Sequence, residues 1–271
     1  MNILSFNKKL IVAGILPVSF FAIISIVSAD TIGQNQIFNV NSKYDQFSRT
    51  SLSATLRNIS NYAYFYVEDR YWDNLNPNGK AILLNNIISL SQEFDNNIYP
   101  KETQFWGAEP NPGIDNDSKI TIILEDLVSG NGGYFDTSNE YLKQTVSDSN
   151  EREMIFISVK AGSFAKVFLG HEFQHLISYN QKELLRKVEE DVWLNELRSE
   201  YSVSLLGYND NFYNSSLERR VETFIENPSD SLTEWPNVSA DYAQATLFGQ
   251  YLVEQFGQSI LSETLQSSAV G

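Results

Sequence analysis

The sequence predicts an α+β fold, with a twisted mixed sheet and a buried helix upstream and a mainly helical part downstream. Two apolar runs of strand length, 119–124 and 154–159, point to the sheet. The second run leads into a helical segment at 163–182, whose apolar side chains cover nearly its whole circumference. From about residue 186 the apolar positions follow helical spacing. We therefore expect an upstream lobe at 30–185 and a helical lobe at 186–271.

Local patterns assign the remaining elements in chain order. The expected series is a polar lead (30–50), a helix (55–60), a strand (63–67), a helix (79–94), the strand at 119–124, a glycine-containing turn (132–135), a polar loop to about 149, and the strand at 154–159. The strand assignments depend on β-branched and aromatic residues. The assignment at 79–94 depends on isoleucines and leucines at helical spacing.

The buried helix carries the string His171-Glu172-Phe173-Gln174-His175, which contains both histidines of the chain. Residues i and i+4 share one helix face, so both imidazoles can reach one metal ion. Glu172 then points beside the metal, which suits a general base acting on a water activated by zinc. A carboxylate among apolar side chains is unfavourable unless something compensates its charge, and a divalent metal does so. The alternative is an accidental string in a buried helix.

The next predicted helix, at 187–206, supplies a carboxylate for the same metal. Glu196 and Glu200 are again i and i+4, so one can bind zinc while the other orients a ligand. We assign Glu196 as the third ligand and Glu200 as the acceptor that orients His171. Two alternatives stay open: Glu200 is the ligand, or these are solvated helix acids, as we expect of Glu189, Glu190 and Asp191.

At these residues the chain resembles the gluzincin metallopeptidases. H-E-x-x-H is followed after about twenty residues by Asn195-Glu196-Leu197-Arg198-Ser199-Glu200, which matches the pattern of thermolysin-like enzymes. With Asn150-Glu151-Arg152-Glu153-Met154-Ile155 and Trp193-Leu194-Asn195-Glu196, the overall likeness is to the hyicolysin-type bacterial family over roughly residues 55–257. The resemblance implies a zincin-like fold, zinc ligands His171, His175 and Glu196, and Glu172 as the base.

The resemblance also raises the question of which side chain stabilises the oxyanion of the reaction. Thermolysin-like enzymes use a histidine and a tyrosine for this purpose, and the chain has no third histidine. A tyrosine or an arginine must then serve. Our candidate is Tyr242, near the start of a helical run that continues to Gly257. The alternative is a tyrosine that only packs a helix interface.

The resemblance to gluzincins also implies a strand of the protein that binds the substrate. Gluzincins hold an extended peptide against an edge strand above the zinc. Asn131, Gly132, Gly133 and Tyr134 lie in the matching place, and the two glycines would let a peptide approach closely. A plain hairpin turn is the alternative.

Two features depart from the pattern or extend it. Many relatives carry glycine after the ligand glutamate, whereas this chain has Leu197 and then Arg198, a cation that pairs with an acid or reaches the substrate. The string Asp115-Asn116-Asp117-Ser118 has the alternating oxygen ligands that suit Ca²⁺, although a polar turn is the simpler interpretation.

The first 29 residues resemble a targeting segment. Lys8 and Lys9 precede the apolar run 10–27, and Val27-Ser28-Ala29 is a small-residue cleavage site. We expect a cleaved signal peptide at 1–29. The uncharged run at 10–29 is also long enough to span a bilayer, so an uncleaved anchor is the alternative. Either way the catalytic part lies outside the cytoplasm, and a membrane is involved only if the segment is uncleaved.

Charge and composition exclude other functions. Removing residues 1–29 removes two lysines and no acid, which changes the net charge from −15 to −17. Phosphates repel such a protein, so nucleic acid is not an expected partner. The absence of cysteine excludes disulfides and thiolate ligands.

The sequence thus predicts a secreted zinc endopeptidase that acts on polypeptides. Three alternatives remain: an aminopeptidase of gluzincin type, a non-catalytic cell-surface binding protein on a zincin fold, and a structural zinc site. Cleavage preference, oligomeric state and a missing C-terminal part are left open.

Overall fold

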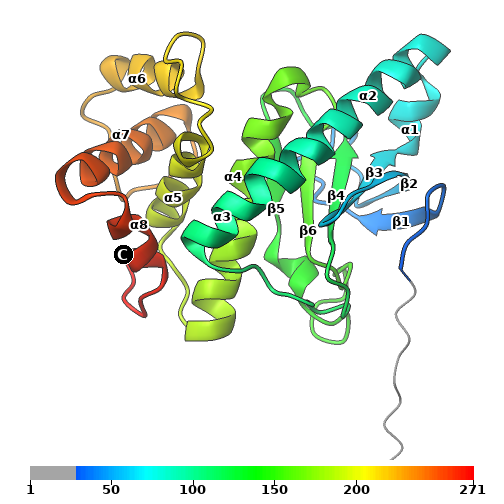
Figure 1. Ribbon diagram of the computed structural model, residues 1–271, viewed down its shortest axis with the longest axis horizontal. Helices are drawn as coiled ribbons and strands as arrows, with labels where there is room; N and C mark the ends of the chain where they lie inside the picture. Colours follow the sequence, from blue (N-terminus) through cyan, green and yellow to red (C-terminus); the bar gives the residue numbers. More distant parts are fainter. Residues whose placement is uncertain (1–28) are drawn as a thin grey trace, which may run out of the picture.

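A six-stranded mixed sheet forms the centre of the upstream half, as the computed structural model of residues 29–271 shows (Figure 1). The strands are β1 (Asn35–Asn39), β2 (Ser51–Ile59), β3 (Ala63–Glu68), β4 (Ile120–Glu125), β5 (Gly133–Phe135) and β6 (Met154–Ser158). Their order in the sheet is β1-β2-β3-β4-β6-β5. β3, β4 and β6 run parallel, β1 and β2 extend the sheet antiparallel to β3, and β5 pairs antiparallel with β6. The predicted α+β class is confirmed.

The parallel strands lie at the centre because both faces of the sheet are covered. Every residue of β3, β4 and β6 is buried, as expected for apolar strands with helices or chain packed on each side. One face packs against α2 (Pro77–Glu93), α3 (Tyr99–Trp106) and α4 (Ala165–Ser178). The other face holds a smaller core that includes side chains of β1 and β2.

The helix predicted at 55–60 is wrong, because residues 55–59 belong to β2. Leu52, Ala54 and Leu56 face the smaller core, and β2 pairs with β1 on one side and β3 on the other. This pairing outweighs the local helical pattern of a short segment. The polar lead at 30–50 also contains a strand, β1, in which Phe38 is buried while Ile37 is 76% exposed.

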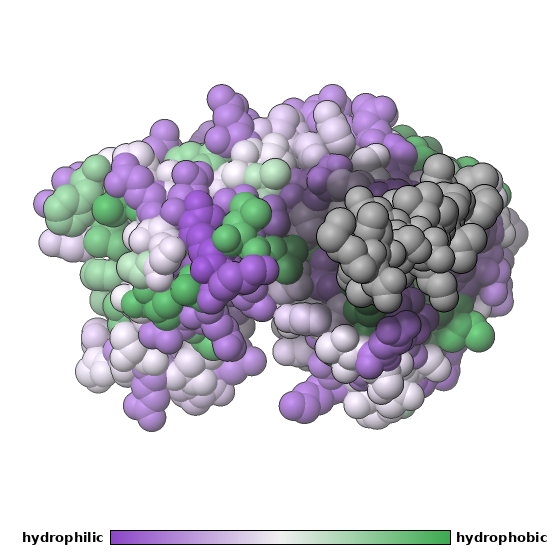
Figure 2. Space-filling model, turned by 90° about the horizontal axis from the view of Figure 1, so that it is seen from below, coloured by the Kyte–Doolittle hydropathy of each residue, from purple (hydrophilic) through white to green (hydrophobic). Residues whose placement is uncertain are grey.

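The downstream half is helical, as predicted. It contains α5 (Val192–Leu205), α6 (Ser216–Glu226), α7 (Ser239–Phe256) and α8 (Ser259–Leu265). α5 packs against α4 on one side and α7 on the other. The main core continues from the sheet through α4 into α5, α7 and α8, while the surface is indented between the two halves (Figure 2). The lobe boundary at 185/186 stays a prediction.

Short helical segments complete the fold. They are α1 (Asp69–Asp73), π-helical turns at Phe94–Ile98 and Tyr179–Leu184, and 3₁₀ turns at Thr137–Glu140 and Gly162–Phe164. The predicted targeting segment lies, apart from Ala29, outside the described residues. Within residues 29–271 no helix has both the length and the apolar character needed to cross a membrane.

A buried acid at the end of β4 makes the stability of the fold depend on pH. Glu125 is fully buried, and one of its oxygens accepts a hydrogen bond from the Tyr134 hydroxyl at 3.1 Å. Burial, with the nearby carboxylates of Asp45 and Glu68, raises the pKa of Glu125 to about 8. Arg49 pairs with Asp45 and Glu68 and leaves Glu125 without a cation of its own.

We expect Glu125→Gln to remove part of this pH dependence. The unfolded chain releases the Glu125 proton near pH 4.5, whereas the folded chain holds it to about pH 8. The folded form therefore loses stability as pH rises between these values, and glutamine abolishes this loss. Urea unfolding at pH 5 and pH 8.5 measures the effect. Between these two pH values, the free energy of unfolding of Glu125→Gln should rise relative to that of the wild type by more than about 1 kcal/mol. Exposed Glu222→Gln is the control, and parallel pH profiles for Glu125→Gln and wild type would contradict the assignment.

Candidate metal centre

Close packing at Gly170 positions α4, the helix that carries the two histidines. α4 begins after the turn that follows β6, and its side chains Phe173, Leu176 and Ile177 are fully buried. Gly170 precedes His171, and a methyl group there would come within 2.4 Å of the Leu206 side chain. α4 thus lies so close to Leu206, the residue after α5, that an added methyl group would displace the end of the Leu206 side chain.

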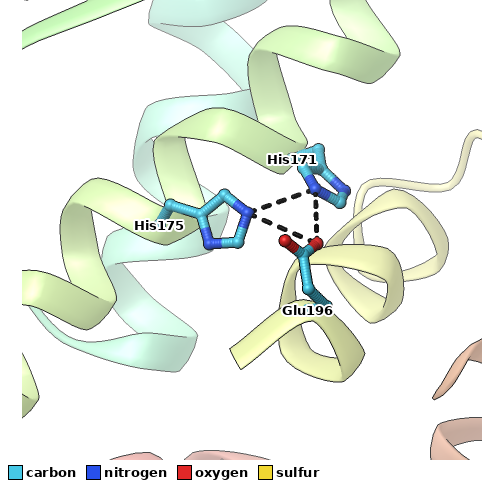
Figure 3. Close-up of side chains that lie close together, drawn as sticks. All are labelled: His171, His175 and Glu196. Carbon is cyan, nitrogen blue, oxygen red and sulfur yellow. Dashed lines mark hydrogen bonds and ion pairs between the residues drawn. The ribbon is translucent and has the colours of Figure 1, made fainter. Parts of the chain in front are cut away.

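His171, His175 and Glu196 converge on one point (Figure 3). The two histidine Nε2 atoms lie 3.2 Å apart, and Glu196 Oε2 lies 3.2 Å from His171 Nε2 and 3.5 Å from His175 Nε2. Ligands at zinc distances of about 2.0–2.1 Å in a tetrahedron would be roughly 3.3 Å apart. The observed separations therefore suit a tetrahedral ion.

The chemistry of these atoms also fits a cation. Glu196 Oε2 is buried and accepts no hydrogen bond, which is costly unless a positive group lies beside it. The histidines lower the pKa of Glu196 although burial acts in the opposite direction. Burial lowers the pKa of His171, but Glu196, Glu172 and Glu200 outweigh it and raise the value to about 9. A metal at this place would compete with a proton for His171.

The outer nitrogens of both imidazoles have partners. His171 Nδ1 lies 3.5 Å from Glu200 Oε1, which is the contact expected from the sequence. Glu200 is itself held by Arg220, at 2.7 and 2.8 Å, and by the Thr246 hydroxyl at 2.8 Å. These contacts fix the carboxylate that faces His171.

Ser199 orients the other histidine. Its hydroxyl donates to Gln174 Oε1 at 2.5 Å, so it accepts from His175 Nδ1 at 3.1 Å. His175 Nε2 is then free for a metal. Ser199 is part of the predicted motif at 195–200, but the motif alone did not predict that it orients His175. Its position three residues after Glu196, on the same face of α5, is the signal that could have found it.

Glu172 lies beside the three candidate ligands. It is 7% exposed, and burial raises the pKa of its carboxyl while His171 and His175 act against that rise. Its side chain packs against Gly133, where a Cβ would come within 3.0 Å of Glu172 Cγ. At Gly132 a Cβ would lie 2.3 Å from the Phe168 ring. Both glycines thus make room for side chains of α4. The sequence predicted a different role for them, the close approach of a substrate peptide.

Gly133 begins β5, an edge strand of the described sheet, and Gly132 immediately precedes it. Gly132 O accepts from Ser158 N at 2.8 Å, and Gly133 pairs with Ile157. In an antiparallel ladder the next residue directs its N–H and C=O the other way, so these groups of Gly133 and Phe135 face the open edge. The Tyr134 side chain points to the opposite face, where it is buried and contacts Glu125.

A cavity of about 310 Å³ joins this edge to the candidate metal site. Asn131, Gly132 and Gly133 line it together with His171, Glu172, Glu200, Arg220 and Tyr242. The Tyr242 hydroxyl donates to Asn237 Oδ1 at 2.8 Å, and burial followed by the carboxylates Glu196, Glu172 and Glu200 raises its pKa. The expected oxyanion candidate therefore lies in the wall of this cavity.

Tyr44 lines the same cavity and was missed by the sequence analysis. Its ring stacks on Tyr134 at 4.8 Å, and its carbonyl accepts from Val128 N at 2.8 Å. Burial and then the carboxylates Glu172 and Glu196 raise its pKa. No local pattern in the polar lead distinguishes this tyrosine, because its position depends on a long-range contact.

The cation after the candidate ligand pairs with an acid. Arg198 is fully buried, and its guanidinium lies 2.7 Å from Glu190, which also pairs with buried Lys182 at 2.8 Å. Glu190 is therefore not the solvated acid expected from the sequence. Two buried cations need a counterion, and Glu190 provides it.

The predicted calcium site uses its carboxylates locally. Asp115 accepts from Asp117 N at 2.8 Å, while Asp117 accepts from Lys119 N at 3.0 Å and from the Tyr64 hydroxyl at 2.9 Å. These bonds form a polar turn before β4. Calcium binding there stays a prediction.

Comparison with known proteins gives one informative relative. No protein-family model matches the chain. It is 33% identical over 209 residues to the neutral metalloprotease ShpI of Staphylococcus hyicus. The match covers 67% of this chain and 45% of the relative, so the chain spans about half the length of that protein.

We expect Glu200→Gln to weaken metal binding without unfolding the protein. Glutamine keeps the shape of the side chain but loses the charge that orients His171, and such changes cost about 10- to 100-fold in affinity. Competition with a zinc chelator measures the effect. Exposed Glu222→Gln is the control, and unchanged affinity in Glu200→Gln would show that the contact with His171 is incidental.

Proposed function

The chain belongs to the metalloprotease family of this staphylococcal relative, and we propose that it is a secreted zinc-dependent endopeptidase. The observation that carries the proposal is the convergence of His171, His175 and Glu196 at 3.2–3.5 Å, with Glu172 buried beside them. A zinc ion held by these three residues would act as a Lewis acid and lower the pKa of water to about 7.

Glu172 is the base in this proposal. Its carboxylate takes the proton from the attacking water and returns it to the nitrogen of the leaving amine. The walls formed by Gly133 and Phe168 limit the access of bulk water to Glu172. His171 and His175 keep their orientation because Glu200 and Ser199 hold the outer nitrogens.

The substrate lies along β5 as an additional strand. The open N–H and C=O groups of Gly133 and Phe135 pair with the peptide backbone, and pairing through the backbone accepts many sequences. Tyr134 offers the substrate no open group, because its main chain faces β6 and its side chain is buried on the other face of the sheet. Extended binding of this kind suits a polypeptide rather than a small molecule.

Two tyrosines line the cavity, and we place both beside the reacting carbonyl. Tyr242 comes from α7 and Tyr44 from the segment before β2. Tyr242 is our oxyanion donor, because it lines the cavity beside His171 and Glu172. Its single hydroxyl hydrogen, which is donated to Asn237 in this structure, would turn to the oxyanion. Tyr44 forms the wall on the β5 side and contacts the substrate.

None of the alternatives from the sequence has an observation in its favour. An intact and buried Glu172 supports catalysis over a purely binding role. The cavity joins an open strand edge, which supports cleavage within a chain rather than at its amino end. Export depends on the predicted signal peptide at 1–29.

Replacing the base tests the proposal. We expect Glu172→Gln, in residues 30–271 loaded with zinc, to lower kcat for a labelled unfolded protein by about 10²- to 10⁴-fold. Zinc content should stay at one ion per chain, as in wild type and in the Glu222→Gln control. A wild type that binds zinc and cleaves nothing would refute the endopeptidase, and a chain that binds no zinc would refute the metal centre.

Removing the hydroxyl group of Tyr242 or of Tyr44 distinguishes the roles of these two residues. Tyr242→Phe should lower kcat by about 10²- to 10³-fold with KM nearly unchanged, because an oxyanion donor acts only in the transition state. Tyr44→Phe should change KM more than kcat, because this side chain contacts the bound substrate. Kinetics on one fluorogenic peptide measure both. The reverse pattern would transfer the oxyanion role to Tyr44.

A further inference from the structure

The Ser199 hydroxyl faces three possible hydrogen-bond partners. Its Oγ lies 2.5 Å from Gln174 Oε1 and 3.1 Å from His175 Nδ1. The carbonyl of Asn195, one turn earlier in α5, is 3.3 Å away. A hydroxyl has one hydrogen to donate, whereas an amide oxygen can only accept. Because Gln174 Oε1 is the nearest acceptor, it takes the Ser199 hydrogen, and a lone pair of Oγ is left for His175 Nδ1.

Gln174 is held in this place from its other end. Its side chain is fully buried on α4, and so is that of Ser199 on α5, where the two helices pack together. Gln174 Nε2 donates to Ser178 Oγ, one turn further along α4, at 2.9 Å. Burial favours the orientation in which both ends of an amide are bonded. The bond to Ser178 therefore keeps the oxygen, and not the nitrogen, turned towards Ser199.

The orientation of this amide determines which nitrogen of His175 carries hydrogen. With the amide oxygen facing Ser199, the hydroxyl accepts from the imidazole, and the imidazole hydrogen must be on Nδ1. If the amide were turned around, its N–H would donate to Ser199 Oγ, and the Ser199 hydrogen could point at Nδ1. The hydrogen of a neutral imidazole would then lie on Nε2, because its two ring nitrogens share one.

A carboxylate on the opposite side of the ring favours the second arrangement. Glu196 Oε2 lies 3.5 Å from His175 Nε2, and it is buried and accepts no hydrogen bond within the described chain. In the metal-free protein it attracts a hydrogen to Nε2, the atom whose lone pair a metal needs. Gln174 and Ser199 act against this attraction, since they stabilise the tautomer with hydrogen on Nδ1.

We propose that Gln174 is a positioning residue of the candidate metal centre: through the Ser199 hydroxyl it holds hydrogen on His175 Nδ1 and keeps Nε2 free for the metal. Among the described residues, Gln174 neither lines the cavity nor belongs to the three that converge on the metal position. Its influence therefore passes through Ser199. The inference rests on the zinc centre of the proposed function, and it is independent of whether that centre cleaves peptides.

The spacing of the H-E-x-x-H string places no demand on the side chain of Gln174. This residue occupies one of the two variable positions, and its partner Ser199 is 25 residues away on another helix. An apolar side chain of the same length would fill the interior equally well but would leave the Ser199 hydroxyl undirected. The glutamine is therefore explained by its hydrogen bonds and not by packing alone.

The tautomer of His175 is the direct measurement. The chain has two histidines, and His175→Ala identifies the signals of His175. Long-range ¹H–¹⁵N spectra of the metal-free protein at about pH 8.5, where an ordinary imidazole is neutral, show which ring nitrogen carries hydrogen. We expect hydrogen on Nδ1 in the wild type and on Nε2 in a measurable share of Gln174→Met molecules. The same distribution in both proteins would overturn the proposal.

Zinc affinity tests the consequence for the metal. Competition with a chelator should show Gln174→Met binding zinc about three- to tenfold more weakly than the wild type, which is the effect of one lost hydrogen bond. In a Ser199→Ala background, where the connection to His175 is already broken, Gln174→Met should change the affinity by less than about twofold. An equal loss in both backgrounds would show that Gln174 acts through packing and would contradict the proposal.

Gln181→Met is the matched control. Gln181 is also a buried glutamine, in the π-helical turn that follows α4, and its amide nitrogen donates to the Ala108 carbonyl at 2.9 Å. That carbonyl also accepts from Asn180 Nδ2 at 2.7 Å, so it keeps a partner in the variant. We expect Gln181→Met to keep the wild-type tautomer and zinc affinity. The same losses as in Gln174→Met would assign the effect to general loosening of the helix and would refute the specific role.

A second variant decides if Gln174→Met does not fold. Ser178→Ala removes the partner of Gln174 Nε2 and frees the amide to turn around. Hydrogen on His175 Nε2 in part of the Ser178→Ala molecules would support the proposal, and an unchanged tautomer would refute it. A wild type that binds zinc and cleaves no peptide would refute the endopeptidase while the role of Gln174 stands. A wild type that binds no zinc would overturn both.

Discussion

The desolvation of three glutamates around His171 is the constraint on which this structure depends. Glu172, Glu196 and Glu200 are removed from water within one small volume, and a carboxylate removed from water needs a positive partner. Arg220 provides that partner for Glu200. Glu196 has only the two imidazoles, which is why this group of side chains fits a metal ion and has no evident purpose without one.

Meeting this constraint requires close approach of the backbone at several places. Gly132 and Gly133 let Phe168 and Glu172 pack against the edge strand, and Gly170 lets α4 contact the end of α5. The ligands of the candidate site come from α4 and α5, while the cavity walls come from β5, α7 and the segment before β2. Close packing at these glycines therefore determines where the candidate ligands and the cavity walls lie.

Buried ion pairs recur where distant segments meet. Arg152 connects Asp30 to the centre of the sheet, and Glu190 joins Lys182 to Arg198 across two helices. The chain has no cysteine, so no disulfide can make these connections. Removing one partner of a buried ion pair destabilises the fold strongly, because the other charge is left buried without compensation.

The sequence by itself determined the α+β class, the central strands, the helix of the histidines and the residues that converge on the candidate site. These features follow from periodicities of 2 and 3.6 and from the i, i+4 spacing of His171 and His175, which are local properties. Only the tertiary structure decided that 55–59 belong to a strand, that Tyr44 reaches the cavity, that Ser199 orients His175 and that Glu190 is buried. Each of these outcomes depends on a partner far away in the chain. Strand pairing, stacking and the demand of a buried charge for a counterion are set by that partner and leave no local pattern in the sequence.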